Sequence, residues 1–305
     1  MNLVKSALCV AVLAGVSFTA AAEVDVYGKA NVTVQSVDEG EGTFSEIKSN
    51  ASRFGLKGSE KLESGLEVIY KVEFQVDLAD DEDDNIKARN QYVGLKGGFG
   101  EVVIGRNDTA LKQSQGKLDL FNDLEGDIKR LFKGENRLGD TVSYKSMDLN
   151  GFRVLATYIA KDQEAGKSGL SGAITYGDAE LKNSQVYLSL AADSEVKGYD
   201  AVRFGAQTKL ADFTVGAMYQ TQEKVDGSAE ADGYLLNATY KMGANTFKAQ
   251  YQVIDFDAGN KIDGLSVGVD HKLSKNAKVF AFYSTFDADN QAESNYLALG
   301  MEYKF

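Results

Sequence analysis

The chain has 305 residues, a net charge of −12, one cysteine, one histidine and no proline. A single cysteine excludes an intrachain disulfide, and one cysteine with one histidine excludes the usual tetrahedral zinc site of cysteine and histidine ligands. The acidic balance argues against a nucleic-acid partner, because phosphates are met by clusters of lysine and arginine.

The first 22 residues have the three parts of a cleaved secretory signal peptide. Lys5 supplies a positive start, Ala7 to Val16 form a short apolar run, and Ala20-Ala21-Ala22 is a small-residue cleavage site. The apolar run is shorter than the ~18 residues that a membrane-spanning helix needs, and no later run reaches that length. We expect residues 1–22 to be removed and residues 23–305 to form one exported domain, either a soluble β protein or an outer-membrane barrel.

Long segments of the mature chain alternate between apolar and polar residues. Between Leu66 and Leu78 every second residue is apolar, and similar alternation runs through residues 24–35 and 247–253. Such segments form strands with two different faces, and several exceed the five or six residues that are usual in soluble proteins. Sixteen strands are predicted, at 24–37, 52–60, 65–78, 87–97, 99–106, 138–147, 150–160, 169–177, 179–192, 198–210, 212–223, 229–243, 245–257, 262–274, 276–287 and 294–305.

The predicted connections alternate between short and long. Tight turns at Gly97-Gly98 and Ala211-Asp212 contrast with longer polar stretches at 79–85 and 160–168. Sixteen is an even number, and short turns on one side with long loops on the other are typical of bacterial outer-membrane barrels. The fold class is therefore all-β, a transmembrane antiparallel barrel of 16 strands.

One connection, at about residues 107–137, is too long for a loop that merely joins two strands. It carries apolar residues that need a surface to pack against, namely Leu111, Leu118, Leu120, Phe121, Leu124, Ile128, Leu131 and Phe132. We predict that this third long loop folds into the lumen and narrows the channel, with a large external loop as the alternative.

Several motifs of the chain occur together in one known family. They are Ser52-Arg53-Phe54-Gly55-Leu56-Lys57-Gly58-Ser59-Glu60, Arg89-Asn90-Gln91-Tyr92-Val93-Gly94-Leu95, Gly98-Phe99-Gly100 with Ile104-Gly105-Arg106, and the terminal Phe305. Through them the mature chain resembles the Gram-negative general porin family. The resemblance implies a homotrimer in the outer membrane, whose barrels are water-filled channels for passive diffusion of ions and small hydrophilic solutes, with no cofactor.

The resemblance also implies a constriction in which basic residues of the barrel wall face acidic residues of the third loop. Arg53, Arg89 and Arg137 stand at the matching motif positions. Lys29 is one of the alternating polar residues of the first strand, and Lys87 lies two residues before Arg89, on the same face of its strand. The expected acidic partners in the loop are Asp119, Asp123, Glu125 and Asp127. Opposed charges across a narrow pore create a transverse field that favours polar solutes. The ion preference stays open, because the wall is basic and the whole chain is acidic.

The last predicted strand ends on an apolar face that includes Tyr303 and the terminal Phe305. Such an ending is similar to the signal that the barrel-assembly machinery reads in outer-membrane proteins. The other expected partners are outer-membrane lipid and lipopolysaccharide.

Other functional readings have weaker support. The run that contains Asp80, Asp81, Asp83 and Asp84 is a weak candidate for divalent cations, but it lacks the spacing of a calcium loop. An enzyme is not expected, because only His271 is available for a catalytic triad. The alternatives to a general porin are an adhesin or structural barrel, a substrate-selective porin, and a soluble periplasmic β protein.

Overall fold

The computed structural model describes residues 23–80, 85–161, 163 and 166–305. The expected signal peptide, residues 1–22, lies outside the described residues. Among those described, no helix is both long and apolar enough to cross a membrane.

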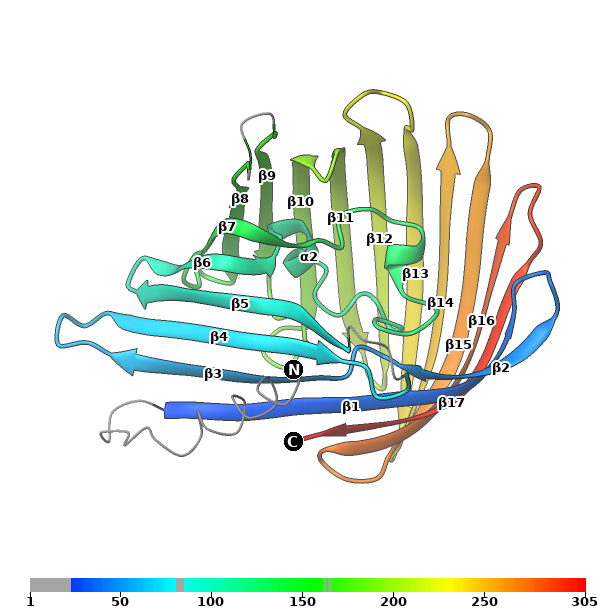
Figure 1. Cartoon of the computed structure of the whole chain (residues 1–305). Coiled ribbons are helices and arrows are strands. Elements are labelled where there is room, and N and C mark those ends of the chain that lie inside the picture. The colour runs from blue at the N-terminus through cyan, green and yellow to red at the C-terminus, as the bar shows by residue number, and fades with distance from the viewer. Residues whose placement is uncertain (1–22, 81–84, 162, 164–165) are drawn as a thin grey trace, which may run out of the picture.

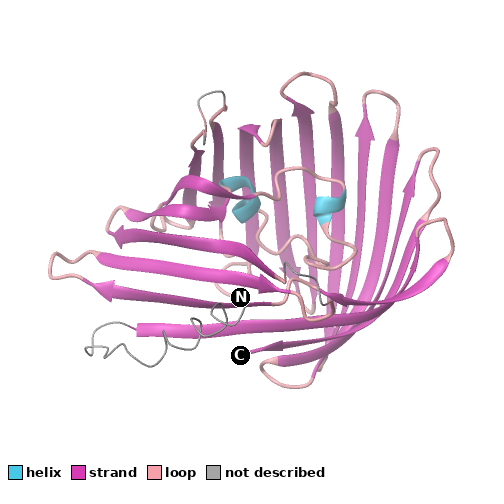
Figure 2. Cartoon of the chain, in the orientation of Figure 1, coloured by secondary structure: helices cyan, strands magenta, loops and turns pink. Residues whose placement is uncertain are grey.

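Helices contribute very little to the described chain, and strands are its main element (Figure 2). They are β1 (Glu23–Asp38), β2 (Thr43–Ser49), β3 (Arg53–Lys61), β4 (Glu67–Val76), β5 (Ile86–Gly97), β6 (Gly100–Asp108), β7 (Arg137–Lys145), β8 (Phe152–Ile159), β9 (Gly169–Tyr176), β10 (Val186–Val196), β11 (Tyr199–Leu210), β12 (Phe213–Lys224), β13 (Ala231–Met242), β14 (Asn245–Phe256), β15 (Lys261–Lys272), β16 (Ala277–Ala288) and β17 (Ser294–Lys304). The connection between β6 and β7 holds the short helix α2 (Ala110–Ser114) and the 3₁₀ helix η1 (Ile128–Arg130).

The strands form one closed antiparallel barrel (Figure 1). Each strand from β3 onward pairs with the next, and β17 returns to pair with β1. β1 pairs with β2 through its second half and with β3 through its first half, so β2 and β3 share one position in the ring. The barrel therefore has 16 strand positions, and closure leaves no free edge.

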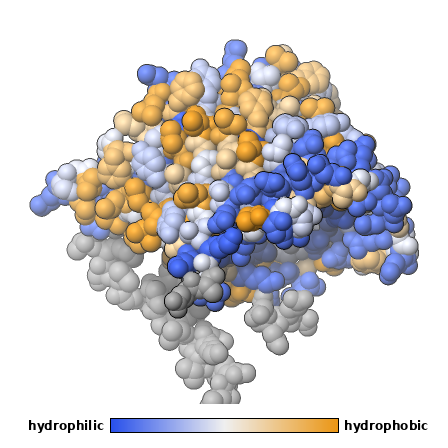
Figure 3. All heavy atoms as spheres, turned by 90° about the horizontal axis from the view of Figure 1, so that it is seen from above, coloured by the Kyte–Doolittle hydropathy of each residue, from blue (hydrophilic) through white to orange (hydrophobic). Residues whose placement is uncertain are grey.

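The two faces of the sheet differ as the alternation predicts. On β17, Leu297 and Leu299 expose 60% and 67% of their surface on the outside, while Tyr296 and Ala298 point inward and are buried. The same outward row of apolar side chains recurs on the other strands, and Figure 3 shows one face of the molecule on which apolar side chains cover a broad area. An apolar surface of this extent suits contact with lipid.

The segment Thr43–Ser49 is a strand that the sequence pattern did not predict. Its exposed apolar residues, Phe44 and Ile47, stand three positions apart, so the segment lacks a period of two. It forms a strand because the second half of β1 offers it a register of seven residue pairs.

The predicted strand 179–192 was wrong at its start, because β10 begins only at Val186. Asp178 closes the preceding connection. Its carboxylate accepts hydrogen bonds from the backbone N–H groups of Glu180, Lys182 and Asn183. A side chain that satisfies three backbone donors competes with the sheet for them.

Candidate functional site

The connection between β6 and β7, residues 109–136, lies inside the ring of strands and is called the third loop here (Figure 1). Its apolar side chains pack on the inner wall in three clusters. Leu111 contacts β8 to β11, Phe121 contacts β16 and β17, and Phe132 belongs to a cluster that reaches from β12 to β17. The loop therefore fills the side of the lumen that these strands enclose.

Polar side chains of the wall fix the backbone of the third loop. The amide of Gln250 on β14 accepts from the Leu120 N–H at 2.9 Å and donates to the Gly126 carbonyl at 2.9 Å. Asn237 on β13 donates to the Leu118 carbonyl at 2.5 Å. Because loop backbone groups that no water reaches need partners, these inward-facing amides allow the segment to be buried.

The tip of the loop brings acidic side chains to the opposite wall. The Asp123 carboxylate accepts a hydrogen bond from Lys29 of β1 at 2.8 Å and forms an ion pair with Arg53 of β3. Burial by itself would raise the pKa of Asp123, but the charges of Lys29 and Arg53 outweigh it and lower the pKa to about 2. Asp123 thus stays ionised, as two adjacent cations require.

Glu125 makes a second contact between the loop and the wall. It accepts from Lys48 of β2 at 2.5 Å and from the Gln35 amide of β1 at 2.9 Å. Burial opposes ionisation of Glu125, yet the hydrogen bonds from Lys48 and Gln35 outweigh it and lower the pKa. Lys48 was absent from the predicted wall because its strand, β2, was not predicted.

A break between β2 and β3 directs Arg53 toward the loop. Ala51 has a positive φ of 49° there, and the Ser52 hydroxyl exchanges hydrogen bonds with the backbone N–H and carbonyl of Asn31. The Ser52 hydroxyl thus replaces backbone hydrogen bonds of the sheet that are lost where β2 ends and β3 begins. Arg53 follows directly, and its Nε donates to the Ala51 carbonyl at 2.9 Å.

Arg89 and Arg137 find their acidic partners on the wall itself. A bulge in β5 turns both Arg89 and Asn90 inward, and Arg89 Nε donates to Glu73 of β4 at 2.8 Å. Arg137 pairs with Asp108 of β6 at 3.0 Å and donates to Asn90 at 2.8 Å. Sequence reasoning missed Glu73 and Asp108 as partners, although Glu73 stands on the polar parity of its strand.

Asp119 and Asp127 do not face the basic wall; they hold the loop in shape. Asp119 accepts from the N–H groups of Phe121 and Ile128, and Asp127 accepts from those of Asp123 and Lys129. Burial, followed by the nearby Asp127 charge, raises the pKa of Asp119 to about 8. Their contribution to the site is to fix the backbone that carries Asp123 and Glu125.

The remaining predicted residues lie apart from the contacts between the third loop and the basic wall. Lys87 is exposed at the loop end of β5, opposite Gln75. Phe305 exchanges backbone hydrogen bonds with Gly28 of β1, and its ring stacks on Tyr303 with centroids 6.3 Å apart. Asp80 is exposed, and Asp81, Asp83 and Asp84 lie outside the described residues.

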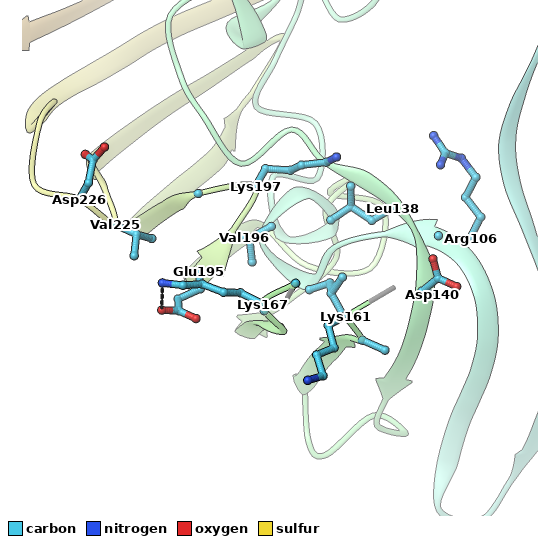
Figure 4. Close-up of a pocket in the computed structure, with 16 residues that line it drawn as sticks. Arg106, Leu138, Asp140, Lys161, Lys167, Glu195, Val196, Lys197, Val225 and Asp226 are labelled. Atoms are coloured by element: carbon cyan, nitrogen blue, oxygen red, sulfur yellow. Dashed lines mark hydrogen bonds and ion pairs between the residues drawn. The ribbon is translucent and has the colours of Figure 1, made fainter. Parts of the chain in front are cut away.

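A recess of about 700 Å³ opens among the long connections, away from the loop tip (Figure 4). Arg106 and Asp140 lie at one side of it and Asp226 at the other, while Lys167 and Glu195 form an ion pair at 3.3 Å. Its lining contains both cations and carboxylates, so the recess presents no single sign of charge.

Known proteins match this architecture and its sequence. A family model described as Gram-negative porin matches residues 7–291. The major outer membrane protein P.IB of Neisseria meningitidis is 26% identical over 345 residues, which cover 99% of this chain and all of that protein. Among solved structures, the anion-selective porin from Comamonas acidovorans superposes with a TM-score of 0.81 at 20% identity, covering 93% of this chain and all of that one. The trimer form of OmpT from Vibrio cholerae gives 0.75 at 18% identity, with the same coverage. The chain therefore belongs to the Gram-negative porin family and forms an outer-membrane channel for the passive diffusion of small solutes.

Proposed function

We propose that the channel is narrowest between the tip of the third loop and the wall formed by β1 to β7, and that charges there select among solutes. The observation that carries the proposal is the contact of Asp123 with both Lys29 and Arg53, which joins loop and wall across the lumen. The cations Arg89 and Arg137 continue the basic wall beyond this contact. Fixed charges of both signs at such a point orient polar solutes and disfavour apolar ones.

Three further parts of the proposal concern partners. Three copies of the barrel associate, as the name of the OmpT trimer form describes for that protein. The outer apolar rows contact lipid and lipopolysaccharide, and Tyr303 with Phe305 is the signal read by the barrel-assembly machinery.

The channel works by diffusion rather than catalysis. Its one histidine, His271, is exposed and bonds to Asn245 through Nδ1 at 2.7 Å.

The experiment is single-channel recording in planar bilayers. Stepwise ohmic currents are expected, and their absence would favour an adhesin or a plugged barrel. In a salt gradient, Arg53→Ser combined with Arg89→Ser should move the reversal potential toward cation preference, because Asp123 and Glu73 each lose a countercharge. Lys182→Ser, which removes an exposed cation in the turn before β10, is the control and should leave the potential unchanged. An unchanged potential in the double variant would remove these two residues from the constriction.

A further inference from the structure

Two pairs of lysines stand directly opposite each other on neighbouring strands of the inner wall. Lys272 of β15 is in register with Lys278 of β16, and Lys304 of β17 is in register with Lys29 of β1. Lys278 and Lys304 alternate with outward-facing Val279 and Tyr303, so they lie on the inward parity. Like charges in opposite register destabilise a sheet. The arrangement therefore has no explanation in the stability of the barrel.

The carboxylates beside these lysines do not balance them. Asp270 lies 3.0 Å from Lys248 and 2.9 Å from Lys278, and Glu302 lies 3.1 Å from Lys304. Among the described residues, no carboxylate lies within 4.0 Å of the Lys272 ammonium. Lys248, Lys278 and Lys304 thus share two acids while Lys272 has none in the described part of the chain, and positive charge is in excess at this place.

Lys272, Lys278 and Lys304 line a small recess at the end of the barrel where the connections are short. Its volume is about 220 Å³, and its walls include Asp270, Lys272, Lys278, Glu302 and Lys304 with residues 274–276 of the turn. Pockets for drug-sized molecules hold about 300–1,000 Å³, so this recess suits a smaller ligand. The excess of positive charge in the recess favours an anion as its ligand.

We propose that this recess binds small multivalent oxyanions, of which inorganic phosphate is the simplest, as they pass through the channel. An ammonium group is a compact charge with three donors, and several oxygens of one phosphate accept from several lysines at once. Asp270 and Glu302 hold Lys278 and Lys304 in place, while Lys272 keeps its donors for the ligand. Lys304 also faces Lys29, the partner of Asp123, so the recess adjoins the basic wall of the constriction.

The proposal rests on the proposed function only in requiring a lumen that solutes can enter. It is tested with chloride current through single channels at about 0.1 M salt, where screening leaves charges within ~10 Å effective. Inorganic phosphate added on the side of the short connections should reduce the current at lower concentration than phosphate added on the other side. Lys272→Gln combined with Lys278→Gln should raise the inhibitory concentration on that side by about tenfold, since charge-assisted hydrogen bonds are lost. Lys182→Gln, at the same end but outside the recess, should match the wild type.

Equal inhibition of the wild type and the double variant would overturn the site. If chloride currents persist in that case, the proposal of a diffusion channel still stands although the phosphate site is refuted. The two proposals can therefore fail separately. Line broadening of the phosphorus-31 signal of phosphate on the purified barrel in detergent gives a readout that needs no current. Broadening by the wild type that the double variant loses supports the site, and equal broadening by both refutes it.

Discussion

The carboxylate of Glu135 lies 2.6 Å from the guanidinium of Arg203, and both side chains are almost closed to solvent. Glu135 belongs to the last part of the third loop and Arg203 to β11. The same guanidinium donates to Gln220 of β12 at 2.6 Å and to the Lys133 carbonyl at 3.0 Å. One arginine therefore fastens the returning end of the loop to the wall.

Replacing Arg203 with methionine should destabilise the barrel by about 3–5 kcal/mol, because Glu135 would remain buried without a countercharge. Heat resistance of the folded form on SDS gels measures the effect. The double variant Arg203→Met with Glu135→Met removes both charges and should recover most of the loss. A single variant as heat-resistant as the double one would contradict this account of the pair.

Replacing Asp123 with asparagine should shift ion preference toward anions. Asp123 has a positive φ of 68°, a conformation that asparagine also tolerates, so the loop tip keeps its shape while Lys29 and Arg53 lose their countercharge. The reversal potential in a salt gradient should move opposite to that of the Arg53 and Arg89 double variant. Asp226→Asn, in the recess among the long connections, is the control. A shift toward cations would exclude this role for Asp123.

Packing of the third loop should weaken as pH rises through about 8. The pKa of Asp119 is raised by burial and by the Asp127 charge, so the carboxyl is protonated in the folded loop at neutral pH. A group whose pKa is higher in the folded state contributes stability that is complete below its ordinary pKa near 3.9 and is lost through its folded pKa. Hydrogen exchange of residues 118–132 should be slower at pH 6 than at pH 9, after correction for the intrinsic rate. The variant Asp119→Asn has no carboxyl group to titrate at this position and should abolish the difference in exchange rate between pH 6 and pH 9. If the difference persists in this variant, another group causes it.

Adding a methyl group at Gly28 should weaken closure of the barrel. A Cβ there would lie 2.2 Å from Cζ of the Phe305 ring, beside the two backbone bonds that join Gly28 to Phe305. Gly28→Ala should cost about 1–3 kcal/mol through overpacking and slow folding into detergent. Adding Phe305→Leu should relieve the clash. Gly172→Ala, where a Cβ would meet no atom within 4 Å, is the matched control. Equal losses at both glycines would point to strand propensity instead.

The alternation of residues was sufficient for predicting the barrel. In Leu66 to Leu78, and again in residues 294–305, a period of two determines which side chains face lipid and which face the lumen, because successive residues of a strand point to opposite sides. The missing proline is consistent with a ring in which nearly every strand position donates to a neighbour. The number of strand positions followed from the same pattern and the turns between them.

The partners of the charged residues depended on the tertiary structure. The motifs placed Arg89 and Arg137 on the basic wall, but a bulge in β5 and the register of β6 with β7 paired them with Glu73 and Asp108 rather than with the loop. Likewise Asp119 and Asp127 looked equivalent to Asp123 in sequence, and only the folded loop buried the first two and exposed the third to the wall. Parity fixes the face on which a side chain lies, whereas its partner depends on register, barrel closure and the path of a loop whose own sequence has no strand period.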